Sequence, residues 1–129
     1  MDWHMEIEMS KIALIADDSS TIRKFVAFAL KSMGIEVVMA SDGMEALEKL
    51  TTEKFDLVIT DLNMPHLDGY ELISSIREIN QYKDTPIIIL SSESDEDDKQ
   101  KGFSAGADSY MEKPFDAKKL QYEVSKFLN

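Results

Sequence analysis

Apolar runs and helical stripes alternate five times along the chain. The first, third and fourth runs are nearly continuous, which is typical of parallel strands that are covered on both faces. The predicted strands are Ile12–Ala16, Ile35–Met39, Phe55–Thr60, Ile87–Leu90 and Asp108–Met111.

Helical stripes fill the intervals between these strands. The first runs from Ile22 to Met33 with apolar residues on one face, and Gly34 supplies a C-terminal stop. The next two helices begin with a capping-box pattern, an aspartate followed three residues later by a glutamate, at Asp42 with Glu45 and at Asp68 with Glu71.

The last two helical segments differ in strength. Residues Glu96–Ala105 have only Phe103 and small residues as an apolar face. The acidic run that precedes and opens this segment suits the N-terminal end of a helix dipole. The fifth helix starts near Asp116 and carries apolar residues at helical spacing. The fourth helix therefore has the weakest pattern of the five.

Strict alternation of strands and helices predicts an α/β fold with one parallel sheet. Right-handed crossovers place helices on both faces, so the sheet is expected to be doubly wound. A length of 129 residues suits a single domain. We expect residues 11–129 to form this domain and residues 1–10 to be an N-terminal extension.

The charge balance narrows the classes of partner. With a formal net charge of −11, the chain should repel nucleic acid and anionic membranes, which are bound through clustered Lys and Arg. The chain has no cysteine, which excludes disulfides and thiolate metal sites and fits a reducing cytoplasm. No apolar run approaches the ~20 residues that a membrane-spanning helix requires.

The residues that directly follow the predicted strands are candidates for a site, because ligands of open α/β sheets bind outside the carboxyl ends of the strands. Helix capping explains a single Asp or Ser in such a loop. It does not explain Asp61, which follows an apolar strand and lies seven residues before the next cap. The candidates are Asp17 and Asp18, Asp61 and Asn63, Ser91 and Ser92, and Lys113.

This combination of side chains favours phosphoryl chemistry. Three clustered carboxylates repel one another by about 3 kcal/mol per pair at ~5 Å and an effective dielectric constant of 20, so they favour a hard dication such as Mg²⁺ or Mn²⁺. Lys113 suits a phosphoryl oxygen, and a carboxylate can form an acyl phosphate. We also expect a raised pKa for at least one carboxyl group. On this basis, Asp17→Ala should stabilise the metal-free protein.

The set Asp17-Asp18, Asp61, Ser91 and Lys113-Pro114 resembles the receiver domain of two-component response regulators, and free-standing CheY-like receivers most of all. The resemblance covers the chain from residue 11 to residue 129. It implies a five-stranded parallel sheet in the order 2-1-3-4-5 with five helices. It also implies that Asp61 is the phosphoacceptor and that Mg²⁺ binds Asp18, Asp61 and the carbonyl group of Asn63, with Asp17 acting mainly through water.

The resemblance also assigns roles around the acceptor. Ser91 and Lys113 would contact the phosphoryl oxygens, and Ser91 with Tyr110 would form the switch. Asn63 and Glu93 would tune self-hydrolysis, for which we expect a phosphoryl lifetime of minutes or less. The family also implies a glycine at the position of Gly69 and, often, a cis Lys113-Pro114 bond. Ser92 departs from the family, which usually has a small apolar residue there.

As a receiver, the chain is implied to take its phosphoryl group from a histidine kinase and to switch binding of a downstream protein, in chemotaxis or another pathway. The binding face would be the fourth helix, fifth strand and fifth helix, on a monomer or weak dimer in the cytoplasm. No enzymatic activity is expected beyond self-catalysed phosphoryl transfer and autodephosphorylation. A phosphate sink and an unphosphorylated interaction module of the same fold remain alternatives.

Two other classes of protein fit the sequence less well. Phosphatases of the haloacid dehalogenase type space their two aspartates by one residue, whereas Asp17 and Asp18 are adjacent. In a flavodoxin-like cofactor module, the segment after the first strand would hold a flavin phosphate, which the same two acids would repel. His66, after Met64 and Pro65, is interpreted as an exposed loop residue rather than a ligand.

Overall fold

The structure is a computed structural model, and it describes residues 10–128. The strands are β1 (Ile12–Ala16), β2 (Glu36–Ala40), β3 (Leu57–Thr60), β4 (Ile87–Ser91) and β5 (Ser109–Glu112). The helices are α2 (Ser20–Lys31), α3 (Gly43–Thr52), α4 (Gly69–Glu78), α5 (Glu96–Ala105) and α6 (Ala117–Phe127), with a short 3₁₀-helix η1 (Asn80–Tyr82). The expected extension, Ser10 apart, lies outside the described residues.

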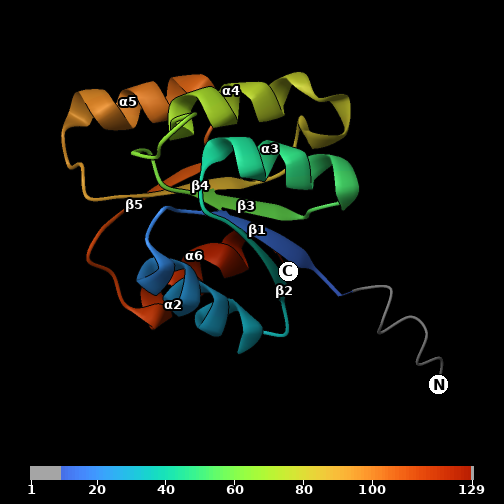
Figure 1. Cartoon of the computed structure of the whole chain (residues 1–129). Helices are drawn as coiled ribbons and strands as arrows, with labels where there is room; N and C mark the ends of the chain where they lie inside the picture. The colour runs from blue at the N-terminus through green and yellow to red at the C-terminus, as the bar shows by residue number, and fades with distance from the viewer. Residues whose placement is uncertain (1–9, 129) are drawn as a thin grey trace.

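The five strands form one parallel sheet in the order β2-β1-β3-β4-β5, as predicted. Helices α3, α4 and α5 cover one face of the sheet, and α2 and α6 cover the other (Figure 1). The strand order reverses between β1 and β3, which both pass through the middle of the sheet. The carboxyl ends of these two strands therefore meet at one edge, where a ligand site is expected.

Two apolar cores, one on each side of the sheet, hold the layers together. Successive residues of a strand point to opposite faces, so Leu14 packs beneath α3 and α4 while its neighbour Ile15 packs against α2. Every residue of β3 is buried. This central position explains why the apolar run of β3 shows no polar alternation.

The two expected capping boxes differ in the structure. At the start of α4, Asp68 accepts a hydrogen bond from the Glu71 N–H and Glu71 accepts one from the Asp68 N–H, which is a complete box. At the start of α3, Asp42 caps the helix through the Glu45 N–H. The carboxylate of Glu45, however, accepts from the N–H and hydroxyl of Ser41, one residue before the cap.

Several predicted strand boundaries were wrong. The second strand is Glu36–Ala40 rather than Ile35–Met39, and the fourth and fifth strands end one residue later than predicted, at Ser91 and Glu112. The third strand begins at Leu57 rather than Phe55, because the Asp56 carboxylate accepts a hydrogen bond from the Ile12 N–H at the start of β1. The fifth begins after Asp108, whose carboxylate accepts from the Ile87 N–H in the same way. Both aspartates therefore mark the entry to a strand instead of forming part of it.

The apolar face that we predicted for α5 is also different. Phe103 is 43% exposed, and the helix instead buries Gly102 against the sheet. A Cβ on Gly102 would lie 2.6 Å from the Cδ1 atom of Ile89, so the backbone of α5 packs close to β4. Helix α5 therefore contacts the sheet through the backbone at Gly102 and not through the large side chain of Phe103, which the pattern suggested.

Candidate phosphoacceptor site

Three of the candidate site residues, Asp17, Asp61 and Lys113, directly follow strands and continue the backbone pairing of the sheet. The Asp61 N–H donates to the carbonyl of Ala16, and the Asp17 N–H donates to the carbonyl of Ala40. The Lys113 N–H donates to the carbonyl of Ser91 over 2.7 Å. The site is therefore built on the rigid end of the sheet rather than on free loops.

The structure brings the three predicted carboxylates together. Asp17, Asp18 and Asp61 each offer one oxygen, and these oxygens lie within 4.8 Å of one another. Asp17 and Asp61 are buried, whereas Asp18 is exposed at the mouth of the cluster. Asn63, the fourth predicted ligand, is exposed in the β3–α4 loop two residues after Asp61.

Lys113 supplies the positive charge within this acidic cluster. Its Nζ atom lies 3.0 Å from Oδ2 of Asp17 and 3.6 Å from Oδ2 of Asp61. Asp17 also accepts a hydrogen bond from the Ser19 N–H, so both of its oxygens have partners. Lys113 therefore bridges the two buried carboxylates while its hydrogen bond goes to Asp17.

The environment raises the pKa of Asp61. Burial is the largest cause and the charge of Asp17 is the next; Lys113 and the Leu62 N–H oppose them. The direction agrees with the prediction of a raised pKa for at least one carboxyl group, but burial contributes more to the raised pKa of Asp61 than the like charge of Asp17 does. In the metal-free protein, Asp61 is therefore a carboxylate whose charged form is disfavoured by its surroundings.

Ser91 ends β4, and Glu93 lies in the loop that follows it. The Ser91 hydroxyl is buried and accepts a hydrogen bond from the Glu93 N–H over 3.0 Å. The Glu93 carboxylate accepts from the side-chain amide of Asn63, 3.4 Å away. The two residues that were expected to tune hydrolysis are therefore neighbours across the site, although they come from different loops.

Tyr110 is half-buried and is bonded to the same loop. Its hydroxyl donates to the carbonyl of Glu93 over 2.9 Å, and burial raises its pKa. The Nζ atom of Lys99 lies 5.9 Å from the ring centroid. Ser92, which departs from the small apolar residue usual in the family, is exposed and makes no hydrogen bond to Tyr110.

Gly69 allows α4 to start directly against the backbone of Asp61. A Cβ on Gly69 would lie 2.2 Å from the backbone carbonyl oxygen of Asp61 and 2.8 Å from Cα of Leu62. The Gly69 N–H donates to the carbonyl of Leu62. This contact between backbones fixes the loop that presents Asp61 and Asn63. The Lys113-Pro114 peptide bond is cis, as the resemblance implies.

The donor set fits a hard dication. All three clustered ligands are carboxylates, whose oxygens Mg²⁺ prefers, and no histidine or cysteine joins them within the described residues. The excess of negative charge over the single Lys113 would be offset by a divalent ion.

Sequence reasoning missed two contacts at this edge. Arg23 of α2 donates from Nη1 to the backbone carbonyl of Asp17 over 2.6 Å. His66 is exposed, as expected, but its Nδ1 atom lies 2.9 Å from the Asp42 carboxylate and its backbone has a φ of 70°. The only signal for Arg23 in the sequence was a cation next to Ile22, where the apolar stripe of the first helix begins.

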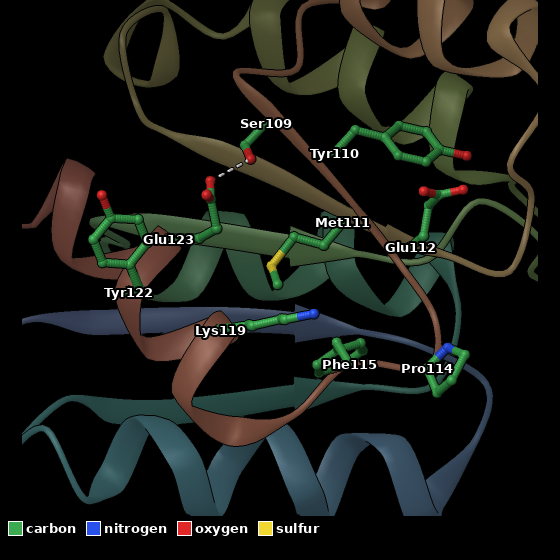
Figure 2. A pocket seen from close by; sticks show the side chains of 9 residues that line it. All are labelled: Ser109, Tyr110, Met111, Glu112, Pro114, Phe115, Lys119, Tyr122 and Glu123. Atoms are coloured by element: carbon green, nitrogen blue, oxygen red, sulfur yellow. Dashed lines mark hydrogen bonds between the residues drawn. The ribbon is translucent and has the colours of Figure 1, made fainter.

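A groove separates β5 from the start of α6 (Figure 2). Its volume is about 430 Å³. Tyr110, Met111 and Phe115 give it apolar surface, and Glu112, Lys119 and Glu123 give it charge. Ser109 donates a hydrogen bond to Glu123 at its far side. Tyr110 thus contacts both the site and this groove.

The model of the response regulator receiver domain matches residues 13–125. This chain belongs to the response regulator receiver family. The structure is similar to the chemotaxis response regulator CheY4 of Vibrio cholerae, with a TM-score of 0.88 and 39% identity, covering 92% of this chain and 99% of that one. Fold class and family, as predicted, are confirmed.

Relatives of the receiver occur both as short proteins and as parts of longer ones. Protein PilG of Pseudomonas aeruginosa is 39% identical over 107 residues, which are 83% of this chain and 79% of that protein. The alkaline phosphatase synthesis transcriptional regulatory protein PhoP of Bacillus subtilis is 39% identical over 120 residues, or 93% of this chain. The chain spans about half of PhoP, at 49% of its length. Among residues 10–128, no helix is long and apolar enough to cross a membrane.

Proposed function

We propose that this receiver accepts a phosphoryl group on Asp61 from a histidine kinase, with Mg²⁺ bound by Asp18, Asp61 and the carbonyl group of Asn63. The observation that carries the proposal is the bridge that Lys113 makes between Asp17 and Asp61 inside a carboxylate cluster. This arrangement combines a nucleophile, a cation for phosphoryl oxygens and a set of oxygen ligands on one rigid edge.

The transfer itself needs little beyond positioning and charge. An Asp61 carboxylate oxygen forms a bond to phosphorus while the bond from phosphorus to the donor's imidazole nitrogen breaks, and that nitrogen keeps the electron pair. Bound Mg²⁺ would neutralise charge on the phosphoryl oxygens. Lys113 is near enough to Asp61 to move from Asp17 to a new phosphoryl oxygen, and the Ser91 hydroxyl can turn to donate to another.

The proposal extends to the output of the domain. Movement of the Ser91 hydroxyl toward the phosphoryl group would affect the Glu93 loop, to which Tyr110 is bonded. Because Tyr110 also lines the groove between β5 and α6, a change at the site reaches the face formed by α5, β5 and α6. We propose that a downstream protein binds there. Asn63 and Glu93 are hydrogen-bonded to each other, and we expect them to flank the route of an attacking water, so the phosphorylated form should decay within minutes or less.

Intact-mass spectrometry after incubation with acetyl phosphate and Mg²⁺ tests the proposal. Wild type should gain one phosphoryl group, and Asp61→Asn should gain none. Asp84→Asn, a change of the same kind at an exposed position outside the site, is the control and should label like wild type. Label that survives in Asp61→Asn, or that is stable in acid at a serine, would refute the assignment. A wild-type label that lasts for hours would contradict the expected lifetime.

A further inference from the structure

The exposed carboxylate of Asp18 has no direct support. Within residues 10–128 it makes no hydrogen bond and no ion pair, in contrast to Asp17 and Asp61. The side chain leaves the backbone at the turn between β1 and α2. Its direction toward the cluster therefore depends on how firmly the peptide that joins Asp17 to Asp18 is held.

Three hydrogen bonds hold that turn. The Asp17 N–H donates to Ala40 on the β2 side, and the Ser19 N–H donates to the Asp17 side chain. The third bond comes from Arg23, whose Nη1 donates to the carbonyl oxygen of Asp17 over 2.6 Å. This oxygen belongs to the peptide that precedes Asp18, so Arg23 contacts the very group that sets the direction of Asp18.

Arg23 is well placed to act as a fixed support. It lies in the first turns of α2, is half-buried, and its own N–H is bonded to Ser19 at the helix cap. A charged donor at this distance makes a short, strong hydrogen bond. The neighbouring Lys24 is exposed and makes no hydrogen bond or ion pair within the described part of the chain.

We propose that Arg23 is a positioning residue for the dication site, which holds the Asp17–Asp18 peptide so that the Asp18 carboxylate is directed at the ion. The inference rests on the proposed Mg²⁺ site. Groups that orient metal ligands typically change metal affinity by 10–100-fold when they are removed. We expect a value at about the lower end, tenfold, because two other hydrogen bonds still hold the turn.

A purely electrostatic role for Arg23 makes the opposite prediction. A cation beside an acidic cluster repels Mg²⁺, so its removal would strengthen binding. A support for Asp18 gives weaker binding when it is removed. The sign of the change in affinity therefore separates the two roles.

Titration calorimetry of Mg²⁺ binding tests the proposal on the full chain. Arg23→Ala should bind Mg²⁺ about tenfold more weakly than wild type, and Lys24→Ala, which removes the same charge from the next residue, should bind at least as tightly as wild type. Arg23→Lys keeps a donor and the charge and should fall between Arg23→Ala and wild type. Unchanged or tighter binding in Arg23→Ala, or Arg23→Lys no better than Arg23→Ala, would overturn the proposal.

Amide hydrogen exchange without Mg²⁺ supplies a readout that is independent of the ion. The peptide that contains residues 17–19 should exchange faster in Arg23→Ala than in wild type, while peptides from β3 and β4 stay unchanged. Equal exchange of residues 17–19 in both proteins would contradict the hold of Arg23 on this turn. If wild type itself binds no Mg²⁺, the proposed function fails, and the exchange result still shows whether Arg23 fixes the turn.

Discussion

Asp17 and Asp61 are two buried carboxylates of one cluster with different electrostatic environments. Asp17 has Lys113 on one oxygen and the Ser19 N–H on the other. Asp61 has the Leu62 N–H and a longer contact to Lys113, and burial raises its pKa. Our expectation that Asp17→Ala stabilises the metal-free protein therefore needs correction. Removing Asp17 would leave Lys113 without its hydrogen-bond partner, which is destabilising for a partly buried pair.

The stabilising substitution is instead expected at Asp61. An acid with a raised pKa in the folded state favours folding when it is protonated, and this contribution is lost as pH rises from about 3.8 through the folded-state pKa. Asp61→Asn, which stays neutral, should therefore melt at a higher temperature than wild type at pH 7 without Mg²⁺. A shift of a few degrees is expected, since 1 kcal/mol corresponds to about 4 °C for a domain of this size.

The pH dependence of this difference is the check. Thermal scans of both proteins should converge as pH falls below about 3.8, where Asp61 is protonated in either state of the wild type. Asp84→Asn again serves as the control and should track wild type at all pH values. If Asp61→Asn is less stable than wild type at pH 7, the positive charge of Lys113 fully offsets the free-energy cost of burying the Asp61 carboxylate.

The sequence identified the chemical groups at the site but not the contacts that hold them. Asp17, Asp61 and Lys113 could be predicted because each directly follows a strand. Arg23 could not, because its role depends on a side chain reaching back to a carbonyl that carries no signature in the sequence. The pairing of His66 with Asp42 likewise depends on the path of a loop.

Among the elements of the fold, α4 and α5 each make a close contact through a glycine, and the two glycines should differ in how well they tolerate a side chain. A Cβ on Gly69 would meet backbone atoms of Asp61 and Leu62, which cannot move without moving the acceptor. A Cβ on Gly102 would be too close only to the Cδ1 end of Ile89, which can change rotamer, and would lie at ordinary van der Waals distance from the Tyr110 ring. Gly69 therefore constrains the site, whereas Gly102 constrains packing alone.

Alanine substitutions at the two glycines should differ accordingly. Gly69→Ala should cost about 3 kcal/mol in free energy of unfolding and slow acetyl phosphate labelling, because overpacking against backbone displaces the Asp61 loop. Gly102→Ala should be within about 1 kcal/mol of wild type, because the gain in helix propensity offsets the contact with Ile89. Urea unfolding and labelling rates measure both effects. Equal losses in free energy of unfolding at the two positions would mean that the loop containing Asp61 shifts to accommodate the new methyl group.

The elements themselves were predicted better than their faces. Apolar periodicity located every strand and every α-helix that the structure describes, since burial on two faces leaves a strong pattern, but it missed the short 3₁₀-helix η1. It misplaced the inner face of α5 because Phe103 is the only large apolar residue there, and the helix buries Gly102 instead. A glycine that lets a helix backbone approach the sheet contributes nothing to the apolar pattern of the sequence.

For the molecule as a whole, the site should couple metal binding to stability. An ion that binds only the folded state stabilises it by about 2.7 kcal/mol at 100 times its dissociation constant. Mg²⁺ at that excess should therefore raise the melting temperature by about 10 °C. The shift should be much smaller in Asp61→Asn, which lacks one ligand charge. The same scan in matched ionic strength of NaCl controls for screening of the net charge of −11. If the melting temperature of the wild type does not change with Mg²⁺, the carboxylate cluster is not a metal site.

Lys113 and Asp17 are hydrogen-bonded although 96 positions separate them along the chain. A ribosome makes all three acids well before it makes this lysine. A nascent or truncated chain that ends before β5 would thus carry the acceptor without its cation, and its acids would repel one another. Sheet pairing over such distances forms late in folding, because the loop must close first. The proposed phosphorylation of Asp61 would therefore become possible only when the whole domain has been synthesised and folded.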